Sequence, residues 1–394
     1  MSETSMQTGL AQRLHSIRKR HGLTQRELAD LSGVSKSLIS KIEQGVVTEP
    51  QMATVHKVAR ALRMNTSTLL NGAPQTEEEE PPIDTGVWEP VERALHGKMP
   101  APQEAPSLPE VRAQIDGLKP LLAANRYGEV AALLPTLIRD VDALGGEGRA
   151  VRSRLFNITG WLCVQLRRWE RAEAPIRLAI DAAEDRLDAA ASAATLAWMY
   201  LRMGRLTEAR ELATRWADDI EPRFSRASAA ELAMWGRLLI SVSSAAVRDN
   251  RPGEAEDAIR LARAAAVRIG REVESDSSTH RTFGPVTVAM VVAENAGIID
   301  HYDKVLSIAD RIPGNLLNGD SAGRNRHRLD VAMALHATGK PAEAMAVLED
   351  IYRTSPEWLV AQKYARQILA GLLMRRRTLP ASTRHLADAL RVPY

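Results

Sequence analysis

Apolar residues three and four positions apart recur along most of the chain, a spacing that places them on one face of an α-helix. At the amino terminus this pattern predicts a helix over residues 10–21, with Leu10, Leu14 and Ile17 inward and Arg13, Arg18, Lys19 and Arg20 in solvent. A second such stretch predicts a helix over residues 51–62, with Met52, Val55, Val58 and Leu62 inward. A short helix from Thr66 to Leu70 is expected to follow.

Two shorter helices are predicted between these, in the stretch TQRELADLSGVSKSLISKIEQG that runs from Thr24 to Gly45. Thr24 and Glu27 have the spacing of a capping box. Gly33 can adopt the positive φ of a sharp turn, and Ser35 is a good N-cap for the second helix. The apolar positions expected to pack the two helices together are Leu28, Leu31, Val34, Ile39 and Ile42.

The order Gln25, Ala29, Gly33, Val34, Ile39, Ile42 resembles the phage-repressor type of helix–turn–helix, often called the XRE or Cro/C1 family. The resemblance extends from about Leu10 to Asn71. It implies that residues 1–72 form a five-helix head that binds a double-stranded DNA operator with its third helix in the major groove. An ordinary helical hairpin in a protein core is the alternative interpretation.

The same resemblance indicates which residues of the head would meet DNA. Gln25 corresponds to a position that contacts the phosphate backbone in that family, and the caps Thr24 and Ser35 stand at helix N-termini that attract phosphate. Lys36, Ser37 and Lys41 match positions that read base edges, with Ser40 nearby, and lysine prefers guanine. In the following loop Thr48 can meet phosphate, but Glu49 departs from the basic residues that family members carry there.

Residues 73–107 are predicted to be a linker rich in proline and glutamate. The charge reverses at this point, because residues 1–72 carry a balance of +5 and residues 73–107 a balance of −6. A basic head suits a polyanion. Within the linker, Asp84 to His96 could form a short tether helix that carries Trp88, Val91 and Leu95.

A weak repeat begins after residue 107, in which a turn is followed by the start of a helix with a small or β-branched fifth residue. The spacing of 37 to 50 residues resembles degenerate tetratricopeptide repeats with lengthened helices, and HEAT-type pairs are the alternative. The six turns begin at Arg126, Arg168, Arg205, Arg251, His301 and Lys340. The resemblance implies an all-α, right-handed solenoid of six to seven helix pairs over residues 108–378, capped by a long helix from Pro356 to Arg377 and followed by a tail at 379–394.

The first helix of each pair is expected to line the concave face of this solenoid, and register taken from the turns selects the inner side chains. Trp161 and Trp198 then occupy equivalent places and either bind a ligand or pack between repeats. Indoles, arginines and an amide suit an extended peptide. The predicted effector site comprises Arg154, Asn157, Trp161, Trp198, Arg202, Arg237, Arg248, Met290, Glu294 and Arg326.

Composition narrows the remaining classes of function. Three Phe and six Tyr beside abundant Ala and Leu favour helices over sheet, and the single cysteine, Cys163, excludes an internal disulfide framework. No signal region or apolar run of about 20 residues is present, so we expect a cytoplasmic protein without a membrane partner. We find no catalytic motif and expect no enzyme, cofactor or metal; His327 and His336 are interpreted as surface groups.

The layout of an XRE-type head, a tether and a tetratricopeptide-like domain resembles the peptide-pheromone-responsive regulators called RRNPP, and many actinobacterial regulators of similar layout. It implies a homodimeric transcription regulator whose repeat domain binds a signalling peptide or another small effector that modulates DNA binding. The alternatives are an interaction scaffold that binds a protein partner and is localised by its head, and an enzyme regulated by DNA.

Overall fold

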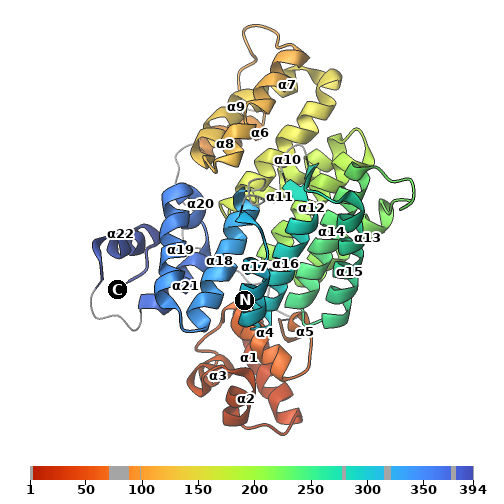
Figure 1. The fold of residues 1–394 in the computed structure, drawn as a ribbon. Helices are drawn as coiled ribbons and strands as arrows, with labels where there is room; N and C mark the ends of the chain where they lie inside the picture. The colour runs from red at the N-terminus through yellow and green to blue at the C-terminus, as the bar shows by residue number, and fades with distance from the viewer. Residues whose placement is uncertain are drawn as a thin grey trace.

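The computed structural model describes residues 3–70, 88–97, 99–276, 281–314, 321–373 and 379–393. Within them the chain forms a small helical head at one end of a larger array of paired helices (Figure 1). The end of the head at residues 71–72, residues 73–87 of the predicted linker and the basic segment Arg375–Arg377 lie outside the described residues. The regular elements among the described residues are helices, apart from one short hairpin, in agreement with the all-α prediction.

The helices fall into three groups along the chain. The head holds α1 (Glu3–Arg20), α2 (Gln25–Ser32), α3 (Lys36–Glu43), α4 (Met52–Ala61) and α5 (Thr66–Leu70). An amino-terminal layer follows with α6 (Trp88–Leu95), α7 (Leu108–Asp116), α8 (Lys119–Ala123), α9 (Tyr127–Ala143) and the 3-10 turn η1 (Gly145–Gly148). The five pairs are α10 (Arg149–Gln165) with α11 (Trp169–Ala182), α12 (Arg186–Arg202) with α13 (Leu206–Asp219), α14 (Ala229–Arg248) with α15 (Pro252–Ile269), α16 (Pro285–Ile298) with α17 (Tyr302–Asp310), and α18 (Ser321–Ala337) with α19 (Pro341–Thr354).

The head forms around the caps that its sequence predicts. Thr24 accepts from the backbone N–H of Glu27, whose side chain accepts from the N–H of Thr24, so the capping box is complete. Gly33 ends α2 with φ +66°, and Ser35 caps α3. The core of the head is a hydrophobic cluster of its own that includes Leu28 and Ile39. The prediction for Leu31 was wrong: its side chain is 61% exposed, because it faces away from α3 and the other helices of the head.

Arg18 was also predicted wrongly, since it is 3% exposed rather than in solvent. Its guanidinium donates to both carboxylate oxygens of Glu43, at 2.5 and 2.8 Å, and to the carbonyl of Leu23. Gln25 donates to the same carboxylate at 2.8 Å. Glu43 is the last residue of α3, so this buried cluster fixes α3 against α1 and α2. Arg13, also predicted to lie in solvent, is partly buried and donates hydrogen bonds to the carbonyls of Leu69 and Leu70.

All six turns predicted from the repeat are present and share one geometry. Each begins where the preceding helix ends in a residue of positive φ, and the next N–H donates to the carbonyl five residues earlier, the bond of a Schellman motif. These bonds measure 2.8 to 2.9 Å in every turn. The residues of positive φ are Asn125, Arg167, Gly204, Asn250, Asp300 and Gly339.

The fifth residue of each turn is the point of closest packing between neighbouring helices. In all six cases it is 6% exposed or less: Val130, Ala172, Ala209, Ala255, Val305 and Ala344. Gly160 shows how near α10 and α11 approach, because a Cβ there would lie 2.2 Å from Ile176. A small or β-branched residue at each of these positions is therefore buried where the neighbouring helices pack.

The two ends of the array close it differently. At the amino-terminal end Trp88 of α6 is buried, with the guanidinium of Arg168 5.0 Å from its ring centre, so part of the predicted tether belongs to the body. At the carboxyl end the predicted continuous helix was wrong. It is divided into α20 (Pro356–Val360) and α21 (Lys363–Leu373), after which α22 (Ala381–Leu390) packs on α19.

A short antiparallel hairpin, which the sequence analysis did not predict, folds onto the inner side of the array. It joins β1 (Val273–Asp276) to β2 (Arg281–Phe283). Phe283 is fully buried against Gly236 of α14, where a Cβ would lie 2.1 Å from its ring. Glu272 accepts from the first N–H groups of α16, so an acidic side chain sits at the positive end of that helix. The hairpin is thus fixed at both ends.

Helix α14 is the one helix among the described residues that is long and apolar enough to cross a membrane by length and composition. Its most apolar window is 83% buried inside the protein. It packs between α12, α13, α15 and α16, where its buried face contributes to the core of the array.

Replacing Glu43 with Gln should destabilise the head, because Arg18 would remain buried without its carboxylate partner. Removing one member of a buried ion pair typically costs about 3 kcal/mol or more. Hydrogen exchange of the α1–α3 amides measures this loss. Asp30→Asn, an exposed change of the same charge on α2, should leave the exchange unchanged. Equal protection in the Glu43 and Asp30 variants would contradict the role assigned to Glu43.

The same cluster predicts acid sensitivity of the head. Burial alone would raise the pKa of Glu43, but hydrogen bonds from Arg18, Gln25 and His15 place it below its usual range. Its contribution to stability is therefore present above the unfolded pKa of about 4.3 and is lost as the pH falls through the lower folded value. Protection of α1–α3 should decline with acid in this way, and this decline should be missing in Glu43→Gln.

Candidate nucleic-acid interface and effector cavity

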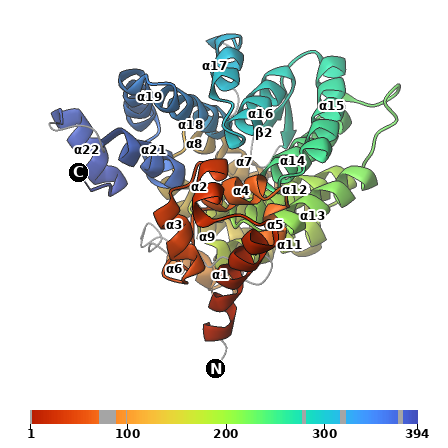
Figure 2. The same ribbon diagram turned by 90° about the horizontal axis from the view of Figure 1, so that it is seen from below.

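Helix α3 presents its polar face to solvent on the outer side of the head. Lys36, Ser37 and Lys41 are exposed and Ser40 is partly exposed, while Ile39 and Ile42 hold the opposite face in the core. Figure 2, seen from below, shows the head in front of the body with α2 and α3 together. The predicted reading helix is therefore accessible in this structure.

The other predicted DNA contacts lie around the same face. Thr24, Ser35 and Thr48 are exposed and Gln25 is partly exposed. The amide nitrogen of Gln25 is held by Glu43, which fixes this side chain at the N-terminus of α2. The sequence analysis missed Glu43 as the residue that orients both Gln25 and α3. Its only sequence signal is a carboxylate at the last position of α3.

A cavity of about 640 Å³ lies on the inner side of the array. Side chains of α10, α12, α14, α16, α18 and α21 line it, so the first helix of each of the five pairs faces inward. The hairpin contributes Arg281, and the head contributes the start of α4. This volume is within the range of small-molecule and short-peptide sites.

Eight of the ten residues predicted for the effector site line this cavity. They are Trp161, Trp198, Arg202, Arg237, Arg248, Met290, Glu294 and Arg326. Their role in binding stays a prediction. The lining also includes residues that the sequence analysis did not select, among them Trp169, Arg281, Asp330 and Tyr364.

Arg154 and Asn157 do not line the cavity. Both lie in the first half of α10, where α7 packs over the helix. Arg154 donates to Asp116 of α7 at 2.8 Å, and Asn157 is 1% exposed within the core. The register inferred from the turns was correct for the second half of α10, but it could not show where the amino-terminal layer begins to cover that helix.

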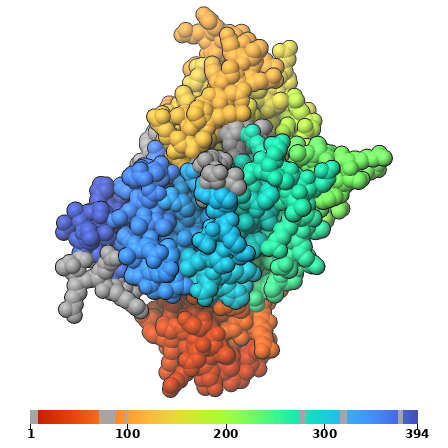
Figure 3. All heavy atoms as spheres, in the orientation of Figure 1, coloured from red at the N-terminus to blue at the C-terminus, as the bar shows by residue number. Residues whose placement is uncertain are grey.

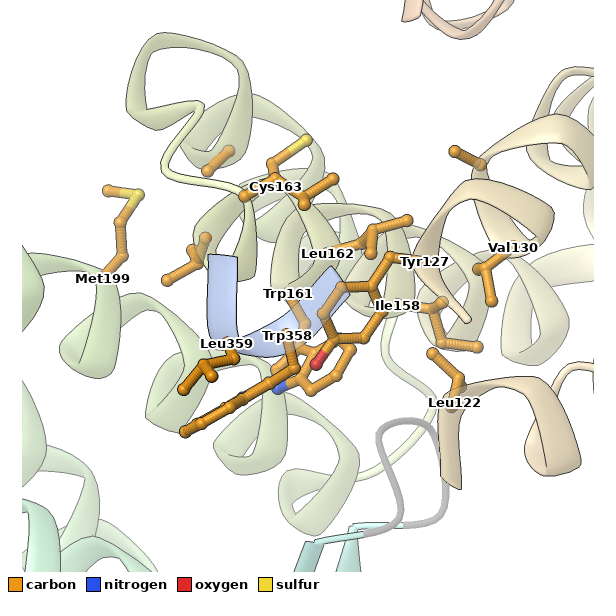
Figure 4. Packing of buried hydrophobic residues seen from close by; sticks show 14 of the residues in the cluster. Leu122, Tyr127, Val130, Ile158, Trp161, Leu162, Cys163, Met199, Trp358 and Leu359 are labelled. Carbon is orange, nitrogen blue, oxygen red and sulfur yellow. The ribbon is translucent and has the colours of Figure 1, made fainter. Parts of the chain in front are cut away.

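The two tryptophans selected from equivalent places differ in environment. Trp161 is 3% exposed and meets Tyr127 edge to face at a centroid distance of 5.8 Å. It lies beside Tyr127 and Trp358 in the core (Figure 4). Trp198 is only partly buried, and the guanidinium groups of Arg202 and Arg281 lie 5.5 and 5.3 Å from its ring centre. Both tryptophans line the cavity, but Trp161 is almost fully buried and also packs against Tyr127, whereas Trp198 is more exposed.

A charged cluster occupies the floor of the cavity. Glu294 pairs with Arg248 and, at 3.2 Å, with Arg326, which also lies 3.4 Å from Asp330. Burial alone would raise the pKa of Glu294, but the two arginines lower it well below its usual range. Burial raises the pKa of Asp330 to about 7, although Arg326 acts in the opposite direction.

The two histidines interpreted as surface groups need a correction. His327 is 4% exposed and lines the cavity, where burial lowers its pKa to about 4, and His336 is partly buried. Cys163 is fully buried, and burial raises the pKa of its thiol to about 12, as a structural thiol requires. Among the described residues, no group of three or more His, Cys, Asp or Glu is placed to hold a metal ion.

The head itself forms part of the cavity wall. Gln51, Met52, Ala53, His56 and Lys57, at the start of α4, all line it. The space-filling view shows the head seated against the lower end of the body without a break (Figure 3). Any molecule that fills the cavity can therefore touch the same helix that supports the head's core.

The head is docked at two of the six repeat turns. At the α14–α15 turn, Asn250 donates to the carbonyl of Met64, and Asp249 accepts from the N–H of Ser67 at 2.7 Å. At the α16–α17 turn, Asp300 lies 3.0 Å from Arg60 and 3.5 Å from Lys57. Asn250 and Asp300 are both residues of positive φ, a conformation that Asn and Asp tolerate better than most side chains.

His56 completes this contact from the buried side of α4. Its Nδ1 lies 2.7 Å from the carbonyl of Arg248 and 3.2 Å from the hydroxyl of Thr66. Burial lowers its pKa, so the imidazole is neutral at pH 7. With the proton on Nδ1, the ring donates to the carbonyl that ends α14.

Residues 14–69, which hold the capping box, the turn glycine and α3, match the helix–turn–helix family. These residues are a helix–turn–helix domain. The matched residues fall within the stretch from Leu10 to Asn71 that the sequence analysis assigned to this type of domain. The match covers only this part of the chain.

Two curated relatives share this domain. The HTH-type transcriptional regulator SinR of Bacillus licheniformis is 38% identical over 68 residues, and SinR of Bacillus subtilis (strain 168) is 37% identical over 68 residues. Each match covers 17% of this chain and 61% of the relative. The chain thus spans less than two thirds of these relatives, and the similarity concerns the helix–turn–helix domain.

One solved structure aligns with a larger part of the chain. It is the crystal structure of Bacillus thuringiensis PlcR in complex with the peptide PapR7 and DNA, aligned over 86% of this chain and 98% of that chain with 14% identity. The TM-score is 0.36, which does not establish a common overall arrangement.

Replacing Asp300 with Asn should loosen the helix–turn–helix domain from the body, because Lys57 and Arg60 lose their carboxylate. For partly exposed ion pairs we expect a cost of about 1 kcal/mol, or about fivefold faster amide exchange in α4 and α5. Asp303→Asn, an exposed change on the same helical pair, is the matched control. Unchanged exchange in both variants would show that these pairs do not hold the domain.

Proposed function

We propose that this protein is a sequence-specific DNA-binding transcription regulator whose repeat domain binds a peptide or another small effector. The observation that carries the proposal is the position of the helix–turn–helix domain: its α3 is exposed, while its α4 forms part of the cavity wall. Regulation requires a surface that reads DNA and a cavity that binds a ligand. The helix–turn–helix domain carries the first and contributes part of the wall of the second.

The DNA-binding half of the proposal is supported by the chemistry of α3. Two lysines and two serines project from one face, the opposite face is buried in the core of the head, and a buried ion pair fixes the end of the helix. A rigid helix with cationic and hydroxyl side chains suits the edges of base pairs and the neighbouring phosphates. The relatives that share this domain are transcriptional regulators by name.

The regulatory half is supported by the docking contacts. A ligand can shift the domain only if it binds the docked and the released arrangements with different affinity. In the docked arrangement the ligand would meet Met52, His56 and Lys57 as part of its wall, and these contacts would be lost on release. Filling the cavity would therefore favour the docked position, and an unfilled cavity would leave the domain freer to move.

We further propose that the protein acts as a homodimer. The helix–turn–helix domain reads DNA with one helix of eight residues, which covers only a few base pairs. Two domains on two half-sites would supply the length of sequence that specific regulation needs. An effector that fixes the docking angle would then set the spacing between the two reading helices.

Operator binding with Lys36→Ala and Lys41→Ala tests the reading helix. Duplexes selected by the full-length protein from a random library provide the operator. Each change should cost about 1 to 3 kcal/mol, or about tenfold or more in affinity, and a lysine that contacts only phosphate should instead lower the salt dependence. Fluorescence anisotropy over a range of salt concentrations separates these outcomes.

Arg112→Ala, an exposed change on α7 at the far end of the array, is the control for loss of charge. It should bind the selected duplex as the wild type does. If Lys36→Ala and Lys41→Ala also bound as tightly as wild type at physiological salt, α3 would not be the reading helix.

Sedimentation of the full-length protein and footprinting on the selected duplex test the dimer. We expect a dimer in solution and a two-fold symmetric footprint, with half-site centres one helical turn, about 34 Å, or a multiple of it apart. A monomer that protects a single asymmetric site would contradict this part of the proposal.

A further inference from the structure

The charged residues that line the cavity are strongly unbalanced. The basic ones are Lys57, Arg167, Arg202, Arg237, Arg248, Arg281, Arg326 and Lys363. The acidic ones are Glu294, Asp300 and Asp330. The balance is therefore +5, although the chain as a whole carries only +3. A concave site with one predominant sign of charge concentrates ligands of the opposite sign.

The positive charge is not evenly spread within the cavity. At the floor, Arg248 and Arg326 share the carboxylate of Glu294, so charge is largely balanced there. Arg202 and Arg281 lie over Trp198, and Arg237 lines the same hollow as Trp198 and Arg281. The acidic lining residues lie on α16, α18 or the turn after α16, and Arg202 is close enough to Glu294 to lower the pKa of that carboxyl. Three of the eight basic lining residues thus lie together on the side formed by α12, α14 and the hairpin.

The geometry around Trp198 is that of a prepared oxyanion site. The guanidinium groups of Arg202 and Arg281 lie over the indole ring, and Arg202 also lies 6.0 Å from the ring centre of Trp169. An arginine stacked on a ring keeps its in-plane N–H groups directed outward, where they can donate in pairs to carboxylate or phosphate. The stacking also restricts side-chain motion before any ligand arrives, which lowers the entropic cost of binding.

Arg237 adds a third cation, whose side chain is held by a hydrogen bond to the hairpin. Its side chain is 7% exposed and donates to the carbonyl of Thr282 in β2. That carbonyl belongs to the hairpin strand that also carries Arg281, so Phe283, packed against Gly236, places both arginines on the same side of the cavity. The hairpin is therefore best explained as the element that completes this site.

We propose that the effector is an anionic ligand whose carboxylate or phosphate group binds between Arg202, Arg237 and Arg281, beside Trp198. This inference rests on the proposed function, in that it assigns the chemistry of the proposed effector. It names oxyanion recognition as the shared chemistry, and a short acidic peptide and a phosphorylated metabolite are its two possible sources.

The test uses the full-length protein and two defined pools of probes. One pool holds random hexapeptides with free carboxyl termini, and the other holds nucleoside mono-, di- and triphosphates. Compounds retained on ultrafiltration are identified by mass spectrometry, and the affinity of the best one is measured by quenching of tryptophan fluorescence. We expect retained compounds to be more negative than the average of their pool, and the pool that supplies them identifies carboxylate or phosphate as the source.

Arg202→Gln and Arg281→Gln should each weaken the best compound about tenfold or more, as expected for loss of a charge-assisted hydrogen bond. Arg281→Lys, which keeps the charge but not the paired donors, should lose less. Arg263→Gln, an exposed change on α15, is the matched control and should bind as the wild type does. The thermal midpoint of each variant verifies that it is folded.

Several results would overturn the inference. These are retention of mainly neutral or cationic compounds, no retention from either pool, or wild-type affinity in folded Arg202→Gln and Arg281→Gln. Binding to the selected duplex is measured on the same samples without probe. If DNA binding is normal while anions are ignored, only this inference fails; if anions bind but no duplex does, the proposed function fails and the anion site stands.

Discussion

The close packing of each repeat turn is the constraint on which the rest of this molecule depends. A residue of positive φ, a Schellman hydrogen bond and a small buried fifth residue recur six times, so successive helix pairs stack in the same way. Regular stacking places the first helix of every pair on one side, and this common side forms the cavity wall. A bulky residue at Ala172 or Ala209 would push neighbouring helices apart and deform the cavity from a distance.

The same turns have acquired a second role where the head meets the body. Asn250 and Asp300 satisfy the backbone of the turn and also bind the helix–turn–helix domain. The docking site is therefore part of the repeat architecture, and any shift between the α14–α15 and α16–α17 pairs moves both halves of the contact. Because α4 lines the cavity as well, the shape of the cavity, the spacing of the pairs and the position of the head are physically linked without a long chain of intermediates.

Within the head, rigidity comes from a buried ion pair rather than from a large core. A domain of this size buries little apolar surface, so polar contacts have a large influence on its structure. Glu43, at the end of α3, accepts hydrogen bonds from side chains of α1 and α2, which fixes α3 while its outer face stays polar. The cavity uses charge in the opposite way, with an excess of cations facing inward around an indole.

The sequence by itself determined the local elements: the caps of α2 and α3, the six turns, and the helical face that each pair turns inward. These follow from contacts between residues close in the chain, which short patterns encode. Only the tertiary structure decided which of those inward residues reach the cavity. Arg154 pairs with Asp116 of α7, and Asn157 is buried in the core. Trp161 lines the cavity but is almost fully buried beside Tyr127 and Trp358, and Arg281 reaches the cavity from an unpredicted hairpin. Each outcome depends on packing between segments far apart in sequence.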